Sequence, residues 1–420
     1  MKLFRWSVAP DGVTPVQREN FRNVQVDAIG IGLANAASPF LPVFLTRLDA
    51  SNLQVGLITS MPALTGFFFA ILAGRFLQKQ RNVVPWFSLS RLLVVSSYAL
   101  TGLAPFLVPR SSLIQVVLLI WAMATLPQTV LNISFSVVMN AVAGPKGRYE
   151  LMSRRWSILG LTTAVTVAAA GLVLDRLRFP LNYQLVFLAL SLGGLLSYYY
   201  SSHIELPDVE PRASGAVALP LRERMRGVMA FVRAHPAFVS FVSKRFVYAT
   251  GAVLTIPLFP LYYVRVVQAS DSWIGLIHTA QTATTLLGYV LWAKLSRSRG
   301  SQFALLCTVF AMGLYPALVG VTRRVEWILV LASLAGIFQA GVDLVFFDEL
   351  MRTIPAEYSA TFVALAASLQ YLSTILGPFL GTWLADGVGI PVALIAGAVL
   401  RLAGFALFAR KSGVAGQAMA

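Results

Sequence analysis

The sequence predicts an all-α polytopic membrane protein, with twelve transmembrane helices in two pseudo-symmetric bundles of six. Of its 420 residues, 57% are apolar or aromatic and 12% are charged, and the mean hydropathy is +0.73. Soluble domains carry about twice that charged fraction. Long apolar runs also recur along the whole chain, and its two halves share short repeated motifs. These observations exclude a soluble enzyme, a nucleic-acid-binding protein and a disordered protein.

The helices are predicted from apolar stretches long enough to cross a membrane. A hydrocarbon core of about 30 Å requires about 20 residues of helix. Most connections between the stretches are short, so consecutive helices are antiparallel neighbours. The twelve stretches are 24–46, 53–74, 83–107, 112–140, 156–174, 182–200, 238–263, 272–293, 302–321, 326–347, 360–384 and 390–408.

One long connection, 201–237, divides the chain into a bundle at 1–200 and a bundle at 238–420. It holds several prolines and much of the loop charge. Apolar residues recur within it at helical spacing, while arginines fall on other faces. We therefore expect an amphipathic helix that lies on the anionic inner leaflet. Its apolar residues are Leu221, Met225, Val228, Met229 and Val232.

The basic residues predict the orientation. The formal charge is 33 − 17 = +16. With the N-terminus in the cytoplasm, 24 of the 33 Lys and Arg residues precede the first helix, lie in inner loops or follow the last helix, and 7 lie on the other face. This obeys the positive-inside rule. We expect both termini in the cytoplasm, an inner (cytoplasmic) membrane location and, since the first 23 residues have no apolar core, no cleaved signal peptide.

An internal repeat relates the two halves. The segment Ser38–Arg47 matches Ile256–Arg265, so that two prolines and an arginine share an offset of 218. Directly after it, Ala50–Ile58 matches Ala269–Ile277 with five identities in nine positions. A weaker sequence match at an offset of 211 pairs Gln128, Asn132 and Phe135 with Gln339, Asp343 and Phe346. We infer that the halves arose by duplication.

The six-plus-six arrangement, the parallel repeat and the basic inner loops resemble the major facilitator superfamily of secondary transporters. Members carry Gly-x-Leu-x-Asp-Arg-x-Gly-Arg-Arg after helix 2. Here the stretch Gly74–Asn82 keeps the glycine and a basic residue, Lys79, but has Gln78 at the acidic position. The copy in the second half keeps Arg297 and has Ser296 there. The resemblance implies gate roles for Gly74, Lys79 and Arg297.

The resemblance also implies a cavity lined by helices 1, 4, 7 and 10, with alternating access by rocking of the bundles. Pro39-x-x-Pro42 is similar to a drug-antiporter signature, whereas the helix 4 arginine and helix 5 Gly-Pro of that subset are absent. Several glycines suit close helix contacts. They are Gly56, Gly74, Gly275, Gly288, Gly377 and Gly381.

Polar residues within membrane helices are costly and normally face a wet cavity or the bundle interior. Gln128 with Asn132, and Gln339 with Asp343, are each spaced i, i+4 on one helix face. We expect them to line a substrate path, and the alternative is that they form interhelical hydrogen bonds. The predicted path comprises Asn35, Gln128, Asn132, Gln281, Gln339, Asp343 and Gln370.

Two groups at membrane depth can bind and release a proton. Asp343 is the one acid well inside a helix of the second half, and His278 is the one histidine at depth. Either is a candidate proton-coupling site. The alternatives are a structural ion pair for Asp343 and a packing role for His278. With so little charge at this depth, a neutral polar or amphiphilic substrate is favoured over a strongly anionic one.

Asp27 and Arg245 are equivalent in the repeat, at the predicted cytoplasmic ends of helices 1 and 7. An ion pair between them would form a gate at the inner mouth. The alternatives for Asp27 are solvation or pairing with Arg22, Arg154 or Arg155. We expect the two arginines inside predicted spans, Arg91 and Arg401, to reach a membrane surface with their charged ends.

Together these features predict a secondary active transporter that moves a small polar or amphiphilic solute, with proton coupling as the preferred mechanism. Export of lipophilic compounds and uptake of a neutral metabolite remain alternatives. The sequence has no phosphate-binding glycine loop, metal-ligand cluster or nucleophile–base spacing, so we expect no enzyme activity, cofactor or metal. The expected partners are the solute, protons and the bilayer, without nucleic acid, and the expected state is a monomer. The rival interpretation is a non-transporting membrane scaffold or assembly factor.

Overall fold

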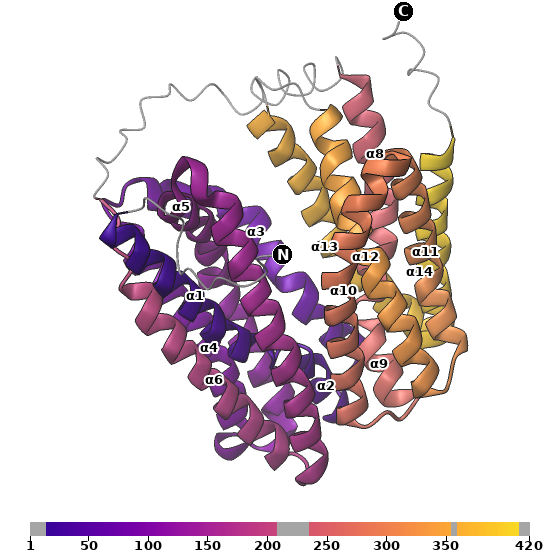
Figure 1. Cartoon of the computed structure of the whole chain (residues 1–420). Coiled ribbons are helices and arrows are strands. Elements are labelled where there is room, and N and C mark those ends of the chain that lie inside the picture. The colour runs from indigo at the N-terminus through magenta and orange to yellow at the C-terminus, as the bar shows by residue number, and fades with distance from the viewer. Residues whose placement is uncertain (1–13, 208–234, 354–358, 411–420) are drawn as a thin grey trace, which may run out of the picture. The chain divides into compact units, whose positions relative to one another are not determined.

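The computed structural model describes residues 14–207, 235–353 and 359–410. Within these ranges the regular secondary structure is entirely helical (Figure 1). The amphipathic helix expected at 221–233 lies outside the described residues. The helices are α1 (Pro15–Asn35), α2 (Phe40–Arg47), α3 (Asn52–Gln78), α4 (Val84–Leu107), α5 (Arg110–Arg176), α6 (Leu181–Ser202), α8 (Pro236–Thr255), α9 (Leu258–Arg265), α10 (Asp271–Arg299), α11 (Ser301–Val321), α12 (Val325–Thr353), α13 (Ser359–Val388) and α14 (Ile390–Ala409).

Ten segments of these described helices are long and apolar enough to cross a membrane. The two remaining predicted spans, 272–293 and 360–384, fall within the helices α10 and α13. The predicted spans 112–140 and 156–174 both lie in α5, whose backbone breaks at Gly144 with φ 62° and ψ −177°. The prediction of an all-α polytopic protein is therefore confirmed.

Prolines break two of the predicted helices at equivalent places. The helix expected at 24–46 is α1 followed by α2, and the helix expected at 238–263 is α8 followed by α9. Pro39 and Pro257 directly precede the short helices α2 and α9. A proline lacks the amide hydrogen that a continuous helix needs and clashes with the preceding turn, so each long helix is interrupted there.

The chain forms two compact units. Unit 1 contains Met1–Ala50, Leu64–Ala213 and Ala269–Thr279, and unit 2 contains Ser51–Ala63, Ser214–Gln268 and Ala280–Ala420. The start of α10 is thus part of unit 1, and the start of α3 is part of unit 2. The simpler division at 1–200 and 238–420 stays a prediction.

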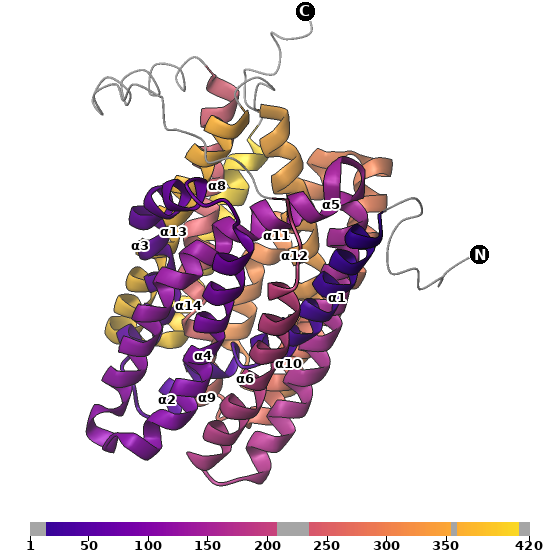
Figure 2. The same cartoon turned by 90° about the vertical axis from the view of Figure 1, so that its left-hand side faces the viewer.

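Helices pack in equivalent pairs within the two units (Figures 1 and 2). In unit 1, α6 packs on α1 and α4, and α4 packs on α5. In unit 2, α14 packs on α8 and α11, and α11 packs on α12. Each unit therefore repeats one arrangement of the first, third, fourth and sixth predicted spans of its half, as the sequence repeat predicts.

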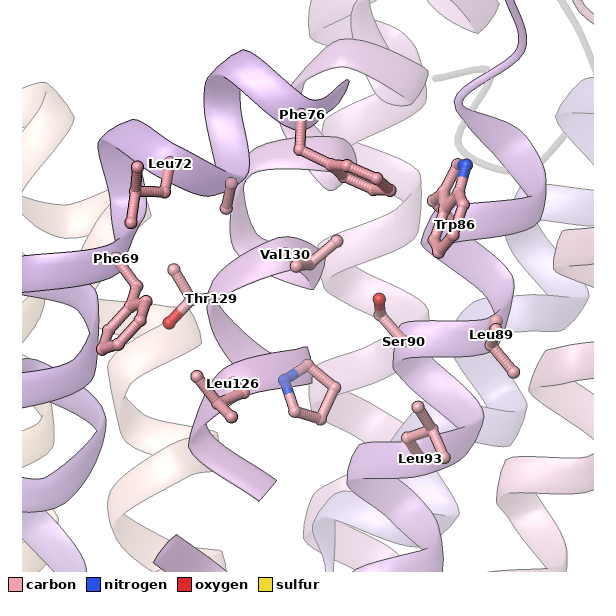
Figure 3. Close-up of a pocket in the computed structure, with 12 residues that line it drawn as sticks. Phe69, Leu72, Phe76, Trp86, Leu89, Ser90, Leu93, Leu126, Thr129 and Val130 are labelled. Atoms are coloured by element: carbon pink, nitrogen blue, oxygen red, sulfur yellow. The ribbon is translucent and has the colours of Figure 1, made fainter. Parts of the chain in front are cut away.

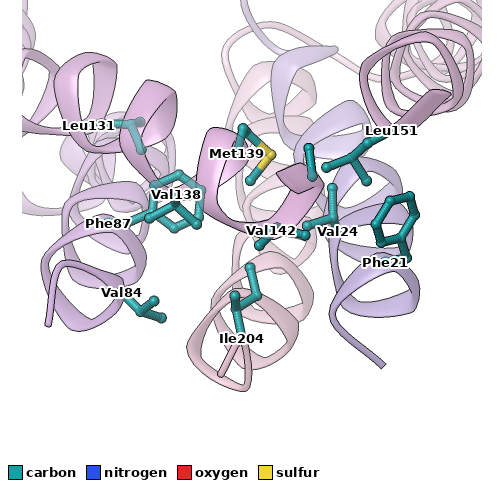
Figure 4. Packing of buried hydrophobic residues seen from close by; sticks show 11 residues of the cluster. Phe21, Val24, Val84, Phe87, Leu131, Val138, Met139, Val142, Leu151 and Ile204 are labelled. Carbon is teal, nitrogen blue, oxygen red and sulfur yellow. The ribbon is translucent and has the colours of Figure 1, made fainter. Parts of the chain in front are cut away.

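A cluster of buried side chains joins α1, α4, α5 and the segment after α6 (Figure 4). Phe21, Phe87 and Leu151 are almost completely buried there. In a membrane, apolar side chains gain little from leaving the lipid, so this packing stabilises unit 1 through dispersion contacts.

Glycines allow close contacts at five of the six predicted positions. A Cβ on Gly288 would lie 2.6 Å from the carbonyl oxygen of Ile337, and one on Gly275 would lie 2.9 Å from that of Val167. Gly56, Gly377 and Gly381 are similarly restricted. Gly74 is the exception, since a Cβ there would have no described atom within 4 Å. The prediction of a close helix contact at Gly74 is therefore wrong.

Candidate functional site

The predicted pair on α12 forms a hydrogen-bonded group with α10. Gln339 Nε2 donates to Asp343 Oδ1 at 2.8 Å, as their i, i+4 spacing allows. The Tyr289 hydroxyl donates to Asp343 Oδ2 at 3.0 Å. Both carboxylate oxygens thus accept a hydrogen bond, while Asp343 is still exposed in unit 2. An exposed carboxylate with two hydrogen-bond partners is able to exchange either partner for a proton or a ligand.

Arg245 on α8 is close enough to Asp343 for their charges to interact. Its guanidinium lies 5.5 Å from the ring centroid of Phe346, which is one turn from Asp343 on α12. Arg245 lies about 13 Å along α8 from Pro236, at 1.5 Å per residue, and so lies inside the helix rather than at its end. The structure therefore brings one acid and one base together in the second unit.

Gln370 lies beside Arg245 at a small cavity between α8 and α13. The cavity has a volume of about 10 Å³, roughly the space of one water molecule. Ser373 lines it as well, and its hydroxyl lies 3.1 Å from that of Thr250. This predicted path residue thus lies among polar groups of its own unit.

The first unit carries the repeat-equivalent pair on α5. Gln128 Nε2 donates to Asn132 Oδ1 at 2.9 Å, the same bond that joins Gln339 and Asp343. Asn132 is exposed and Gln128 half-buried. Asn35, at the last residue of α1, is exposed too. The repeat therefore extends from the sequence to the side-chain geometry, with an amide in unit 1 where unit 2 has an acid.

His278 and Gln281 lie one turn apart on α10, and both are half-buried. His278 has an interaction partner in the described structure. The Gln281 carbonyl oxygen accepts hydrogen bonds from Thr284 at 3.1 Å and Thr285 at 2.7 Å. The hydrogen bonds of the Gln281 carbonyl oxygen thus lie within α10.

Asp27 lies in a buried charge cluster within unit 1. Its carboxylate is completely buried and accepts hydrogen bonds from Arg91 on α4 and from Ser197 on α6, the latter at 2.6 Å. Arg155 Nη2 lies 3.7 Å from its second oxygen. Of the alternatives left open by the sequence, pairing with Arg155 is the one that the structure shows.

The expectation that Arg91 and Arg401 reach a membrane surface is wrong. Arg91 is 3% exposed because it pairs with Asp27, and its guanidinium lies 4.4 Å from the ring centroid of Phe87. Arg401 is 5% exposed. It donates to the carbonyl oxygen of Met312 at 2.8 Å and to the Thr255 hydroxyl at 3.2 Å. Internal acceptors thus replace the water that these charges would otherwise require.

A second polar network holds the start of α10 within unit 1. Arg47 Nη2 donates to Asp271 Oδ1 at 2.8 Å, and the Tyr183 hydroxyl donates to the same oxygen at 2.7 Å. The Asp175 carboxylate accepts from the backbone amides of Asp271 and Ser272 at 2.8 and 3.1 Å. A carboxylate at a helix N-terminus satisfies free amides and complements the helix dipole.

The repeat places an equivalent network within unit 2. Arg265 Nη1 donates to Asn52 Oδ1, and Asn52 Nδ2 donates to Asp386 Oδ1, both at 2.7 Å. Arg265 is equivalent to Arg47 at the offset of 218, and Asn52 is equivalent to Asp271 at the offset of 219. We call these two networks the terminal clamps. The arginine shared by the two copies of the repeat was the sequence signal that could have identified them.

The residues of the degenerate motifs lie at helix ends. Lys79 is exposed directly after α3. Arg297 is exposed in the last turn of α10, where its Nε donates to the Ala293 carbonyl oxygen at 3.0 Å. Gly74 and Gln78 line a cavity of 350 Å³ between α3, α5 and the segment after α6. Gln78, at the position where the family motif has an acid, therefore lines a cavity within unit 1 with an amide side chain.

Among the described residues, no group of three His, Cys, Asp or Glu side chains could hold a metal ion. The candidate site is therefore built from single titratable groups with amide and hydroxyl partners. Groups of this kind can bind a proton or a ligand through hydrogen bonds and charge.

The sequence model of the MFS_1 like family matches residues 32–393. The solved structure of the nucleoside transporter NupG has a TM-score of 0.71 at 10% identity, covering 94% of this chain and 100% of that one. A bacterial homologue of the iron transporter ferroportin gives 0.70 at 14%, covering 94% and 99%. The human organic anion transporter MFSD10 gives 0.61 at 16%, covering 94% and 100%. No curated protein sequence matches the chain.

Proposed function

Because this chain belongs to the MFS_1 like family, within the major facilitator superfamily, and is a membrane transporter by family and fold, we propose that it is a proton-coupled secondary transporter of a small polar or amphiphilic solute. The observation that carries this proposal is the hydrogen-bonded Asp343 on the transmembrane helix α12. Polar and ionisable groups at membrane depth mark substrate and proton pathways.

Asp343 is proposed to couple proton binding to solute binding. The charged carboxylate accepts hydrogen bonds from Gln339 and Tyr289 and balances the charge of Arg245. Protonation removes that charge and makes one oxygen a donor, so Gln339, Tyr289 and Arg245 become available to a ligand. While Asp343 is charged its charge interacts with that of Arg245, and in that state a neutral polar or amphiphilic solute fits this group better than a strongly anionic one.

The remaining predicted path residues would contribute neutral contacts. Asn132 and Gln128 already form a hydrogen bond to each other, which a solute with a donor and an acceptor could replace. Asn35, Gln281 and Gln370 are proposed as further polar contacts on the same path. His278 is the second candidate for proton coupling, because an imidazole nitrogen can bind and release a proton.

Alternating access is proposed to use the helix ends. The terminal clamps around Asp271 and Asn52 hold the first turns of α10 and α3, and their hydrogen bonds are proposed to exchange during a transport cycle. Gly74, Lys79 and Arg297 are proposed to take part in the gate by their places in the family motif. The Asp27–Arg245 gate pair stays a prediction, since the described partners of Asp27 are Arg91, Arg155 and Ser197.

Export of lipophilic compounds and uptake of a neutral metabolite are both proposed directions of transport. The structural neighbours are named as transporters of nucleosides, of organic anions and, by homology, of iron, so no single class follows from them. The lysine and arginine distribution supports an inner (cytoplasmic) membrane location with both termini in the cytoplasm.

The first test is thermal unfolding of the purified protein at pH 5.5 and 7.5 against sugars, amino acids, nucleosides, lipids, organic anions and cationic drugs. A ligand at 100 times its Kd stabilises the folded state by about 2.7 kcal/mol. We expect one class to raise the Tm in a pH-dependent manner, and Asp343→Asn to abolish the dependence on pH. Asn132→Asp is the opposite change, because it introduces an acid at the position in unit 1 that is equivalent to Asp343.

The rival proposal is a membrane scaffold or assembly factor. It is favoured by one observation, the amide of Gln78 and the hydroxyl of Ser296 where the family motif has acids. If no compound class changes the Tm at either pH, while a partner protein co-purifies with the chain, the scaffold would replace the transporter as the better explanation.

A further inference from the structure

A recess lies in unit 1, and the residues that line it are different from the predicted path residues. It has a volume of 420 Å³ and lies between α3, α4 and the first part of α5 (Figure 3). Figure 3 shows the side chains of Phe69, Phe76 and Trp86 around it. This volume is within the range of small-molecule sites, about 300–1,000 Å³.

The lining of the recess selects an apolar ligand. Its polar groups are two hydroxyls, from Ser90 and Thr129. The Thr129 hydroxyl already donates to the carbonyl oxygen of Thr125 at 2.9 Å. A ligand rich in hydrogen-bonding groups would therefore lose its water here without gaining partners. The methylene groups of an apolar ligand form no hydrogen bonds with water, so they lose none when they enter the recess.

The open side of the recess is formed by exposed apolar residues. Leu72, Leu89 and Leu93 are 56%, 42% and 49% exposed, and they lie on the helices α3 and α4, which have the length and apolarity of membrane spans. An exposed apolar opening on helices of this composition suits contact with lipid hydrocarbon. An acyl chain of a bilayer lipid has the matching chemistry and reaches the opening from its own phase.

Basic side chains follow at one end of the recess. Phe76 and Trp86 form an edge-to-face pair with ring centroids 4.6 Å apart, and tryptophan is typical of the membrane interface. Arg75 and Lys79 are exposed at the same end of α3. Lys79 follows Phe76 at i+3, so it extends the helix face that lines the recess. Two exposed cations next to an interfacial aromatic pair complement an anionic lipid headgroup.

We infer that the recess between α3, α4 and α5 binds one acyl chain of an anionic phospholipid, whose headgroup contacts Arg75 and Lys79. The residues that line the recess are all different from those of the proposed transport path, whereas Lys79 belongs to the proposed gate as well. The degenerate motif, Gly74–Asn82, begins at the end of α3 that the bound lipid would contact. The inference therefore gives this motif region a lipid-dependent function.

The test is native mass spectrometry of the detergent-purified full chain with added dioleoylphosphatidylglycerol, dioleoylphosphatidylcholine or oleic acid. We expect saturable binding of one phosphatidylglycerol, with weaker binding of the other two. Each basic residue contributes about fivefold in affinity to an anionic lipid. Arg75→Gln with Lys79→Gln should therefore weaken phosphatidylglycerol binding about 25-fold and leave phosphatidylcholine binding unchanged.

Two variants fill the recess, Val130→Trp and Leu93→Trp, and either should abolish the saturable binding. The matched control is Leu161→Trp, which adds the same side chain at a position of α5 that is 64% exposed and outside the recess. Thermal unfolding without lipid verifies that each variant is folded. The inference is overturned if a folded filling variant binds as the wild type does, or if phosphatidylcholine or oleic acid binds as tightly as phosphatidylglycerol.

Discussion

Replacing Asp27 by asparagine should destabilise the protein more than any other single removal of a carboxylate within unit 1. The substitution keeps the size of the side chain but removes the negative charge between Arg91 and Arg155. Both arginines are 3% exposed, and Asp27 is completely buried. The variant would therefore leave two positive charges in a region that neither water nor another described carboxylate reaches.

The magnitude follows from this burial. Breaking a buried ion pair by removing one partner costs about 3–5 kcal/mol, because the remaining charge is uncompensated. Removing Arg155 instead should cost less, since Asp27 would keep its hydrogen bonds to Arg91 and Ser197. We therefore expect Asp27→Asn to be more destabilising than Arg155→Met.

The assay is reversible unfolding in mixed detergent micelles, which gives the free energy of unfolding of each variant. A matched control is Glu19→Gln on the same helix, which removes a carboxylate 3.7 Å from Arg22 in a pair whose side chains are 61% and 59% exposed. Exposed pairs contribute about 0–1 kcal/mol. If Asp27→Asn and Glu19→Gln lower the free energy of unfolding equally, the reasoning about the buried cluster is wrong.

Two further predictions concern packing and the terminal clamps. Gly288→Ala should lower the Tm because the new methyl group would lie 2.6 Å from the Ile337 carbonyl oxygen. Gly74→Ala is the control and should leave the Tm unchanged, because its methyl group meets open space. Equal Tm values for the two variants would contradict the close contact at Gly288. Asp271→Asn removes the charge that accepts from Arg47 and Tyr183. It should cost about 3 kcal/mol in the same unfolding assay, and a cost below about 1 kcal/mol would show that the clamp does not stabilise unit 1.

The sequence predicts the fold because its signals are long or repeated. An apolar run of about 20 residues has few structural solutions in a bilayer, and ten of the predicted spans satisfy that test. The repeated prolines explain why the helix breaks at Pro39 and Pro257 coincide in the two halves. The spacing of Gln339 and Asp343 likewise predicts one helix face, and their hydrogen bond follows from it.

Contacts between distant segments are what the sequence does not reveal. Arg91 looks like a residue that extends to the membrane surface until α1 is placed beside α4 and α6, where Asp27 and Ser197 surround it. Tyr289 carries no signal of its own, because only the packing of α10 on α12 brings its hydroxyl to Asp343. The role of Arg47 was visible as a repeated residue, but its partner Asp271 is 224 positions away.

The proposed transport mechanism depends most on Asp343 as the proton-coupling site. The direct measurement uses proteoliposomes that contain a pH-sensitive dye, to which the compound identified by thermal unfolding is added. Asp348→Asn, on the same helix, is the control for removal of a nearby acid. We expect the wild type and Asp348→Asn to move protons when the compound is added, while Asp343→Asn binds the compound and moves none. Proton movement by Asp343→Asn at the wild-type rate would contradict the proposed role of this carboxylate.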